Sequence, residues 1–166
     1  LLQQRAQKLT DSARLLAADY GFREAVNSND TETIASVLEN HGQRIGATQV
    51  ALYGTDLSLR ASTGEHLETL SSLAMRLSST MLSPDRPLES NTSEIGLLSG
   101  QPYQFVMVPG KAPVVVGWVL MGFPIDKRLV NDMQALAAVQ VTLLTRLHAT
   151  AAWQVKLSSL PSGSTE

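Results

Sequence analysis

The sequence predicts an α+β fold in which one five-stranded antiparallel sheet is combined with a long helix at each end of the chain. Two observations predict the sheet: short alternating apolar runs in residues 49–63, and residues 95–125, which carry a single charge. A third observation predicts the helices, because the first and last segments have apolar residues at helical spacing. The length of 166 residues fits a single domain, which we place at residues 1–157.

Residues 1–27 have the pattern of a long amphipathic helix. Its apolar residues are spaced by 4, 3, 4, 3 and 4 positions: Leu2, Ala6, Leu9, Ala13, Leu16 and Tyr20. Such a heptad pattern is typical of helices that pack together at a shallow angle. We therefore predict a homodimer in which Leu2, Leu9 and Leu16 make the helix contact. The alternative is an amphipathic helix that packs on its own domain.

Two shorter helices and a β-hairpin follow. The pair Asn29-Asp30, with Glu32 as the partner in a capping box, indicates the start of a helix that ends at Gly46. Two alternating runs on either side of residues 55–58 then predict a β-hairpin. The next helix opens at Thr63-Gly64 and ends before Ser83-Pro84.

Residues 112–125, which include VVVGWVLMGFPI, carry no charge and could belong to a membrane span or to a buried strand. A spanning helix needs about 20 apolar residues, so this segment is too short. Its β-branched residues favour a strand. Because alternate positions on both faces are apolar, we predict a central strand that is covered on both sides.

A final helix is predicted at residues 127–157. Asp126 can cap its N-terminus, and its apolar positions are Leu129, Met133, Leu136, Leu143 and Leu147. No charge occurs between Asp132 and Arg146, which indicates burial on more than one face. Residues 158–166 have the composition of a tail or linker.

Composition and motifs exclude several functions. The chain has no cysteine, and its net charge of -2 comes without a basic stripe, so we expect no thiolate metal site and no nucleic-acid partner. Neither a G-x-S-x-G nucleophile motif nor a phosphate-binding loop occurs. The histidines lie in three different predicted helices. We therefore predict no metal, no cofactor and no enzymatic activity for this domain.

A few polar or aromatic residues on the predicted strands are candidates for binding a small molecule: Tyr53, Arg60, Tyr103, Gln104 and Trp118. Arg60 lies between apolar neighbours and could bind a carboxylate. Its alternative role is an outward-facing charge on an edge strand. For the large rings the alternative is an ordinary place in the core.

Three stretches resemble a known family: residues 19–47, the strand pair ALYGTDLSLRAST, and PVVVGWVLMGFPID leading into a helix. They resemble the periplasmic PAS-like, or Cache-type, sensor domains of bacterial membrane signalling proteins with GGDEF and EAL output domains or a histidine kinase. The resemblance implies a PAS-like fold, a periplasmic location between two transmembrane helices, dimerisation through the long helices and a small-molecule pocket on the sheet. It does not identify the ligand.

The predicted function is therefore an extracytoplasmic sensor that binds an unknown small molecule on its sheet. A relay through Asp126, Leu129 and Met133 would carry the signal along the final helix to a cytoplasmic output domain, either a kinase or a domain of cyclic-di-GMP turnover. The alternative is a cytoplasmic PAS- or GAF-like module that acts by dimerisation, without a ligand.

Overall fold

The computed structural model describes residues 2–81, 93–111, 114–137, 142–145 and 152–158. Its elements, in chain order, are α1 (Leu2–Ala17), α2 (Tyr20–Ser28), α3 (Thr31–Ile45), β1 (Gln49–Tyr53), β2 (Leu59–Ser62), α4 (Leu67–Met81), β3 (Ser93–Leu98), β4 (Gln101–Lys111), β5 (Val115–Pro124), α5 (Lys127–Ala137), β6 (Thr142–Thr145) and β7 (Gln154–Ser158).

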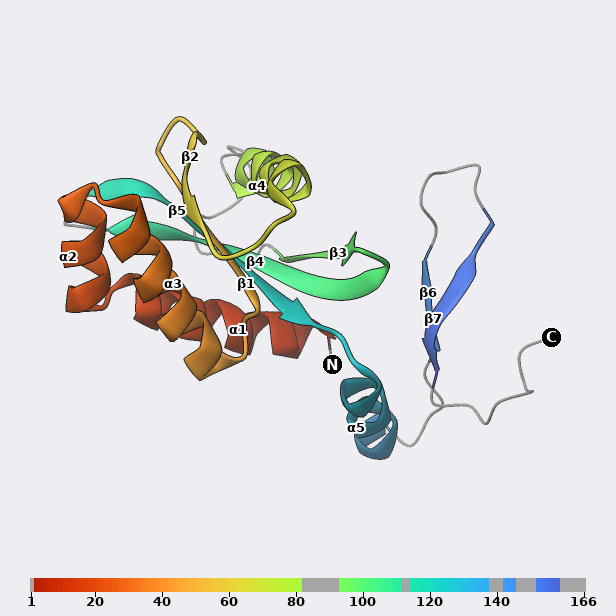
Figure 1. The fold of residues 1–166 in the computed structure, drawn as a ribbon. Coiled ribbons are helices and arrows are strands. Elements are labelled where there is room, and N and C mark those ends of the chain that lie inside the picture. The colour runs from red at the N-terminus through yellow and green to blue at the C-terminus, as the bar shows by residue number, and fades with distance from the viewer. Residues whose placement is uncertain (1, 82–92, 112–113, 138–141, 146–151, 159–166) are drawn as a thin grey trace.

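The main sheet has five strands in the order β2-β1-β5-β4-β3, and every neighbouring pair is antiparallel. Strand β5 lies at the centre, between β1 and β4 (Figure 1). The predicted hairpin is β1–β2, and the three strands predicted from residues 95–125 are β3, β4 and β5. The predicted α+β fold class is confirmed.

Helices cover both faces of the sheet. On one face, Val119, Met121 and Phe123 of β5 pack in a core with residues of α1, α2 and α3. On the other face, Trp118 and Leu120 pack in a second core with residues of α4. Burial of both faces confirms the prediction of a central strand, and it makes β5 common to the two cores.

The N-terminal segment differs from the predicted single helix over residues 1–27. Helix α1 ends at Ala17, and Asp19 starts α2 as an N-cap whose carboxylate accepts a hydrogen bond from the Phe22 amide at 3.2 Å. An aspartate favours this capping position over a helix interior, which explains the break.

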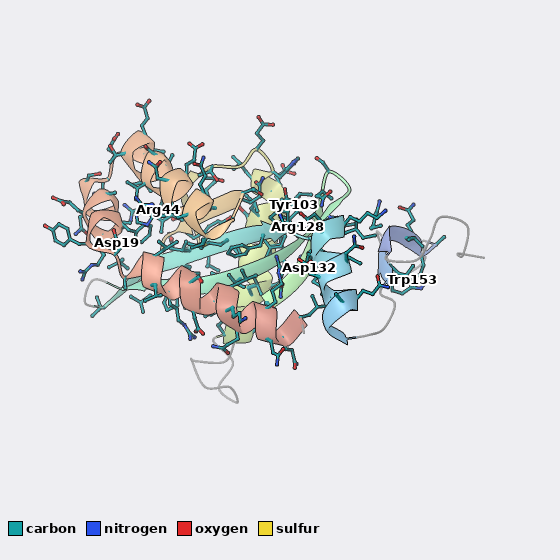
Figure 2. The ribbon with its side chains drawn as sticks, turned by 90° about the horizontal axis from the view of Figure 1, so that it is seen from below. Asp19, Arg44, Tyr103, Arg128, Asp132 and Trp153 are labelled. Carbon is teal, nitrogen blue, oxygen red and sulfur yellow. The ribbon has the colours of Figure 1, made fainter. Side chains whose placement is uncertain are left out.

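Helix α1 packs on its own domain. The small residues of the heptad pattern, Ala6 and Ala13, are buried, and Leu9 and Leu16 pack against the core beside α2 and α3. Figure 2 shows α1 lying along one face of the sheet, where it contacts mainly β4. The alternative of an amphipathic helix on its own domain therefore describes this packing, while self-association through Leu2, Leu9 and Leu16 stays a prediction.

The final helix is shorter than the predicted 127–157. Helix α5 ends at Ala137, and β6 pairs with β7 in a separate two-stranded antiparallel sheet. An uncharged run is compatible with a buried helix or a strand, and the β-branched residues Thr142, Thr145 and Val155 favour the strand. Leu147 and residues 159–166 lie outside the described residues.

Two opposed glycines allow a test of how closely the central strands approach. Gly110 on β4 and Gly117 on β5 are paired. A Cβ atom at Gly117 would lie 2.2 Å from the Tyr53 carbonyl oxygen, whereas at Gly110 the nearest atom would be 3.8 Å away. We expect Gly117→Ala to lower the free energy of unfolding by about 1–3 kcal/mol.

Thermal unfolding measures this difference. For a domain of this size, the loss corresponds to a fall in Tm of roughly 3–10 °C. Gly110→Ala is the matched control and should unfold within about 2 °C of the unmodified protein. Equal Tm values for the two variants would contradict the close approach of β5 to β1.

Candidate functional site

Two of the five predicted ligand residues come together beneath α4. Tyr53 on β1 and Trp118 on β5 are cross-strand partners and face the α4 side of the sheet. Their exposed fractions are 0% and 6%. The neighbouring core residues are apolar, and they include Leu70, Ala74, Leu77, Met107 and Leu120. The described part of the chain has no fully buried charged side chain, so the core beneath α4 is uncharged.

The hydroxyl of Tyr53 is the unusual group beneath α4. It is buried, and within the described residues no group stands in full hydrogen-bond geometry to it, although the Ser71 side chain on α4 lies close enough to interact with it. Burial raises the pKa of Tyr53 above its ordinary value of 10.0, and Ser71 on α4 opposes this rise. A buried polar group without a partner costs about 1–3 kcal/mol. The hydroxyl can therefore gain from a bound molecule that offers it a hydrogen bond.

Tyr103 lies on the same side of the sheet but at its other end. It pairs with Pro124, and the six residue steps from Trp118 to Pro124 span about 20 Å. Its ring stacks on Phe105 with centroids 5.8 Å apart, and its hydroxyl accepts a hydrogen bond from Thr48 at 3.4 Å. Figure 2 shows Tyr103 near α5, far from Asp19. It cannot share a small pocket with Tyr53.

Gln104 belongs to the opposite face of the sheet, because successive strand residues alternate. Only 2% of it is exposed. Its amide oxygen accepts a hydrogen bond from the Arg5 guanidinium, and its amide nitrogen donates to the Leu2 carbonyl at 3.3 Å. The structure therefore gives Gln104 a contact with α1 and separates it from Tyr53.

Arg60 faces the end of α2. The pairing of β1 with β2 shifts at Leu52 and Tyr53, whose partners are Ala61 and Leu59, so Arg60 is the extra residue of a β-bulge. Its guanidinium donates hydrogen bonds to the Val26 carbonyl at 3.2 Å and to the Asn29 side chain. These acceptors satisfy Arg60 at the C-terminus of α2, away from Tyr53 and Trp118.

The predicted relay residues follow directly after β5. Asp126 is the N-cap of α5, since its carboxylate accepts a hydrogen bond from the Leu129 amide at 2.8 Å and its carbonyl accepts one from the Val130 amide at 3.2 Å. Val130 is buried, and Leu129 and Met133 are half-buried. Helix α5 therefore starts at a fixed position relative to the end of β5.

Arg5 is the residue at this junction that the sequence analysis missed. Besides Gln104, it reaches the Pro124 carbonyl, which accepts a hydrogen bond at 3.4 Å. Burial lowers the pKa of Arg5, and the charge of Asp126 raises it. A signal was present in the sequence: Gln104 is a polar residue in an apolar strand, and a buried amide requires partners.

Two surface grooves lie elsewhere. One, of about 330 Å³, lies between the end of α3 and β1, and its lining residues include Glu39, Gln43, Thr48 and Thr63. The other, of about 540 Å³, is lined by Gln3, Gln4, Ala6, Gln7 and Ser93. Neither groove contains a predicted ligand residue. Within the described ranges, no group of three metal-ligating side chains occurs. None of the described helices has the length and hydropathy of a transmembrane span.

The Tyr53 hydroxyl gives a prediction about pH. Tyr53→Phe should leave stability at pH 7 unchanged or raise it by about 1 kcal/mol, because it removes a buried polar group that has no partner. Above about pH 10 the unfolded tyrosine ionises, while the raised pKa keeps the folded one neutral. The unmodified protein therefore loses stability as the pH rises past 10, and Tyr53→Phe should lack this contribution.

Urea unfolding of the unmodified protein and of Tyr53→Phe, at pH 7 and at pH 10.5 to 11, measures this difference. The higher pH lies up to about one unit above the ordinary tyrosine pKa. The control is Tyr20→Phe, since Tyr20 is 71% exposed and should give no difference in pH dependence. A loss of more than about 1 kcal/mol at pH 7 in Tyr53→Phe would mean that the hydroxyl has a partner after all.

Comparisons with known proteins agree with this fold. The periplasmic domain of Vibrio cholerae LuxQ has a similar structure, with a TM-score of 0.63 and 12% sequence identity; the match covers 99% of this chain and 76% of that one. A search of curated proteins found no match. Residues 1–166 match the dCache_3 family, described as the double sensory domain of two-component sensor kinases. This match confirms the resemblance to Cache-type sensor domains, and the chain belongs to the dCache_3 family of sensory domains.

Proposed function

We propose that this chain is an extracytoplasmic sensor domain that binds a small molecule beneath α4 and passes the signal through β5 to α5. One observation carries the proposal. Strand β5 provides Trp118 and Leu120 to the core beneath α4, and the same strand runs directly into the Asp126 cap of α5. A displacement of β5 therefore acts on the start of α5 without an intermediate element.

The chemistry beneath α4 supports an uncharged ligand. The core there is mostly apolar, and its polar groups include the Tyr53 hydroxyl, Ser71, the buried Ser78 and the Trp118 indole. Transfer of a charged group into such surroundings without a partner costs several kcal/mol. A small, largely apolar molecule that accepts a hydrogen bond from Tyr53 fits best. Because the side chains there are packed, binding requires α4 to move away from the sheet.

A small displacement is sufficient for signalling. Coupling between two sites in allosteric proteins is typically about 1–3 kcal/mol, and packed interfaces respond to small shifts by changing between discrete arrangements. Leu129 and Met133, both half-buried on α5, are the residues that such a shift would repack. The relay through Asp126, Leu129 and Met133 is therefore part of the proposal.

The comparisons support the choice of compartment and output. LuxQ has this fold in a periplasmic domain, which favours an extracytoplasmic location over a cytoplasmic interaction module. The family description names a sensor kinase, which favours a kinase output over cyclic-di-GMP turnover. In this proposal the domain itself performs no catalysis, and transmembrane helices in the same protein connect it to the kinase.

Ligand binding can be tested by a thermal-shift screen of the protein. The compounds would be amino acids, carboxylates, purines, polyamines, divalent metals and small neutral molecules. A ligand at 100 times its Kd stabilises the folded state by about 2.7 kcal/mol, which raises the Tm by roughly 5–10 °C. We expect such a shift from the neutral class, and a smaller one in Tyr53→Phe, with Tyr20→Phe as control. No shift from any compound, or equal shifts in Tyr53→Phe, would contradict the ligand site.

The relay can be tested by a comparison of two helix caps. Asp126→Ala should cost about 1 kcal/mol of stability through loss of an N-cap, and it should also change the basal kinase output of the membrane protein. Asp30→Ala is the matched control, because Asp30 caps α3 in the same way, with the Thr33 amide 2.9 Å from its carboxylate. If both variants changed the output to the same extent, instability alone would explain the effect and the relay would be wrong.

A further inference from the structure

The first turn of α1 and the end of β5 lie side by side, although about 120 positions separate them in the sequence. Figure 1 shows the N-terminus next to the point where β5 leads into α5. Hydrogen bonds join Leu2 and Arg5 of α1 to Gln104 of β4 and Pro124 of β5. The start and the end of the five-stranded domain therefore meet at one corner.

Gln104 holds this corner together through the hydrogen bonds of its side-chain amide. It is almost fully buried, so both ends of its amide need partners. Arg5 provides the donor for its oxygen, and the Leu2 carbonyl provides the acceptor for its nitrogen. Both partners come from α1, which is thereby held in register on the sheet.

Arg5 then continues the contact from Gln104 to the end of β5. The two terminal nitrogens of its planar guanidinium bind different acceptors, Nη1 the Gln104 side chain and Nη2 the Pro124 carbonyl. Its charge is attracted by Asp126, two residues further along the chain. A guanidinium can bridge two acceptors in this way because its donors have a fixed fork geometry, which a lysine ammonium lacks.

We propose that Arg5 is a positioning residue that joins α1 to the β5–α5 junction, so that a displacement of β5 acts on both helices at once. The role of the junction in signalling rests on the proposed function, whereas the physical connection does not. Through this connection, α1 becomes a second helix, besides α5, that responds to a displacement of the sheet. A displacement of the junction at Asp126 then either moves α1 as well or is opposed by α1, because Arg5 connects the two.

Hydrogen–deuterium exchange without ligand tests the connection directly. The amides to follow are those of Ile125, Leu129 and Val130, which donate to Pro102 and Asp126 at the junction. In Arg5→Met the side chain keeps an unbranched stem of similar length to that of arginine and loses the guanidinium with its donors and charge. A hydrogen bond to a charged group contributes about 1.5 kcal/mol or more, so we expect these amides to exchange roughly tenfold faster.

Two further variants distinguish positioning from general loss of structure. Lys8→Met changes an exposed charge on the same helix and should leave the junction amides unchanged. Arg5→Lys keeps the charge near Asp126 but cannot bridge both acceptors, so its exchange should lie between those of Arg5→Met and the unmodified protein. Amides in α3 and β1 should keep their protection in all three.

The proposal is overturned if Arg5→Met and Arg5→Lys leave the exchange of Leu129 and Val130 unchanged, even where α1 itself exchanges faster. That result would mean that Arg5 only attaches α1 to the sheet. It is also overturned if all amides of the domain accelerate equally in both variants. Because no ligand is present, these outcomes are independent of the thermal-shift screen, and either proposal can fail without the other.

Discussion

Because β5 is apolar on both faces, the sheet has to be covered twice, and this constraint determines where helices α1 to α4 lie. Three helices from the N-terminal third of the chain cover one face, and α4 covers the other. The strand has no edge exposed to water either, since β1 and β4 flank it. Any group that binds on one face or moves at one end of β5 therefore affects elements that are distant in the sequence.

Two buried polar residues illustrate how differently the two faces are used. Gln104 on the α1 side has partners for both ends of its amide, so it contributes to a fixed connection. Tyr53 on the α4 side has a buried hydroxyl without a partner in the described structure. A satisfied polar group makes a unique arrangement more stable, whereas an unsatisfied one favours rearrangement or binding. Gln104 thus contributes to a fixed connection at the junction, and the ligand site proposed above uses the Tyr53 hydroxyl beneath α4.

The sequence was sufficient for the features that depend on local pattern. The uncharged run of residues 112–125 predicts β5, and alternation on both faces predicts its double burial, because each needs only residue type and period. The helix break at Asp19 was also visible as an N-cap signal, but the heptad spacing suggested a continuous helix. In a short helix, a regular apolar spacing does not distinguish packing on a sheet from packing on another helix.

Features that depend on tertiary structure could not be predicted in this way. Arg60 turns toward α2 because of one extra residue in β2, and a bulge reverses the face expected from alternation. Tyr103 and Trp118 are both strand aromatics, yet strand register alone places them at opposite ends of the sheet. The partnership of Arg5 with Gln104 joins positions 99 apart. This hydrogen bond can be recognised only once α1 is placed on the sheet.

The β5–α5 junction also bears on the β6–β7 hairpin, because α5 lies between the junction and the hairpin. Figure 2 shows the β6–β7 hairpin, marked by Trp153, on the far side of α5 from the main sheet, and in Figure 1 the hairpin stands beyond the β3–β4 end of the sheet. A two-stranded sheet is marginally stable by itself, and its residues Leu144 and Val155 are about half exposed, at 47% each. Such a hairpin takes its orientation from what it contacts, and β7 contacts α5. Because β7 contacts α5, the proposed relay through Asp126 would act on the hairpin through α5.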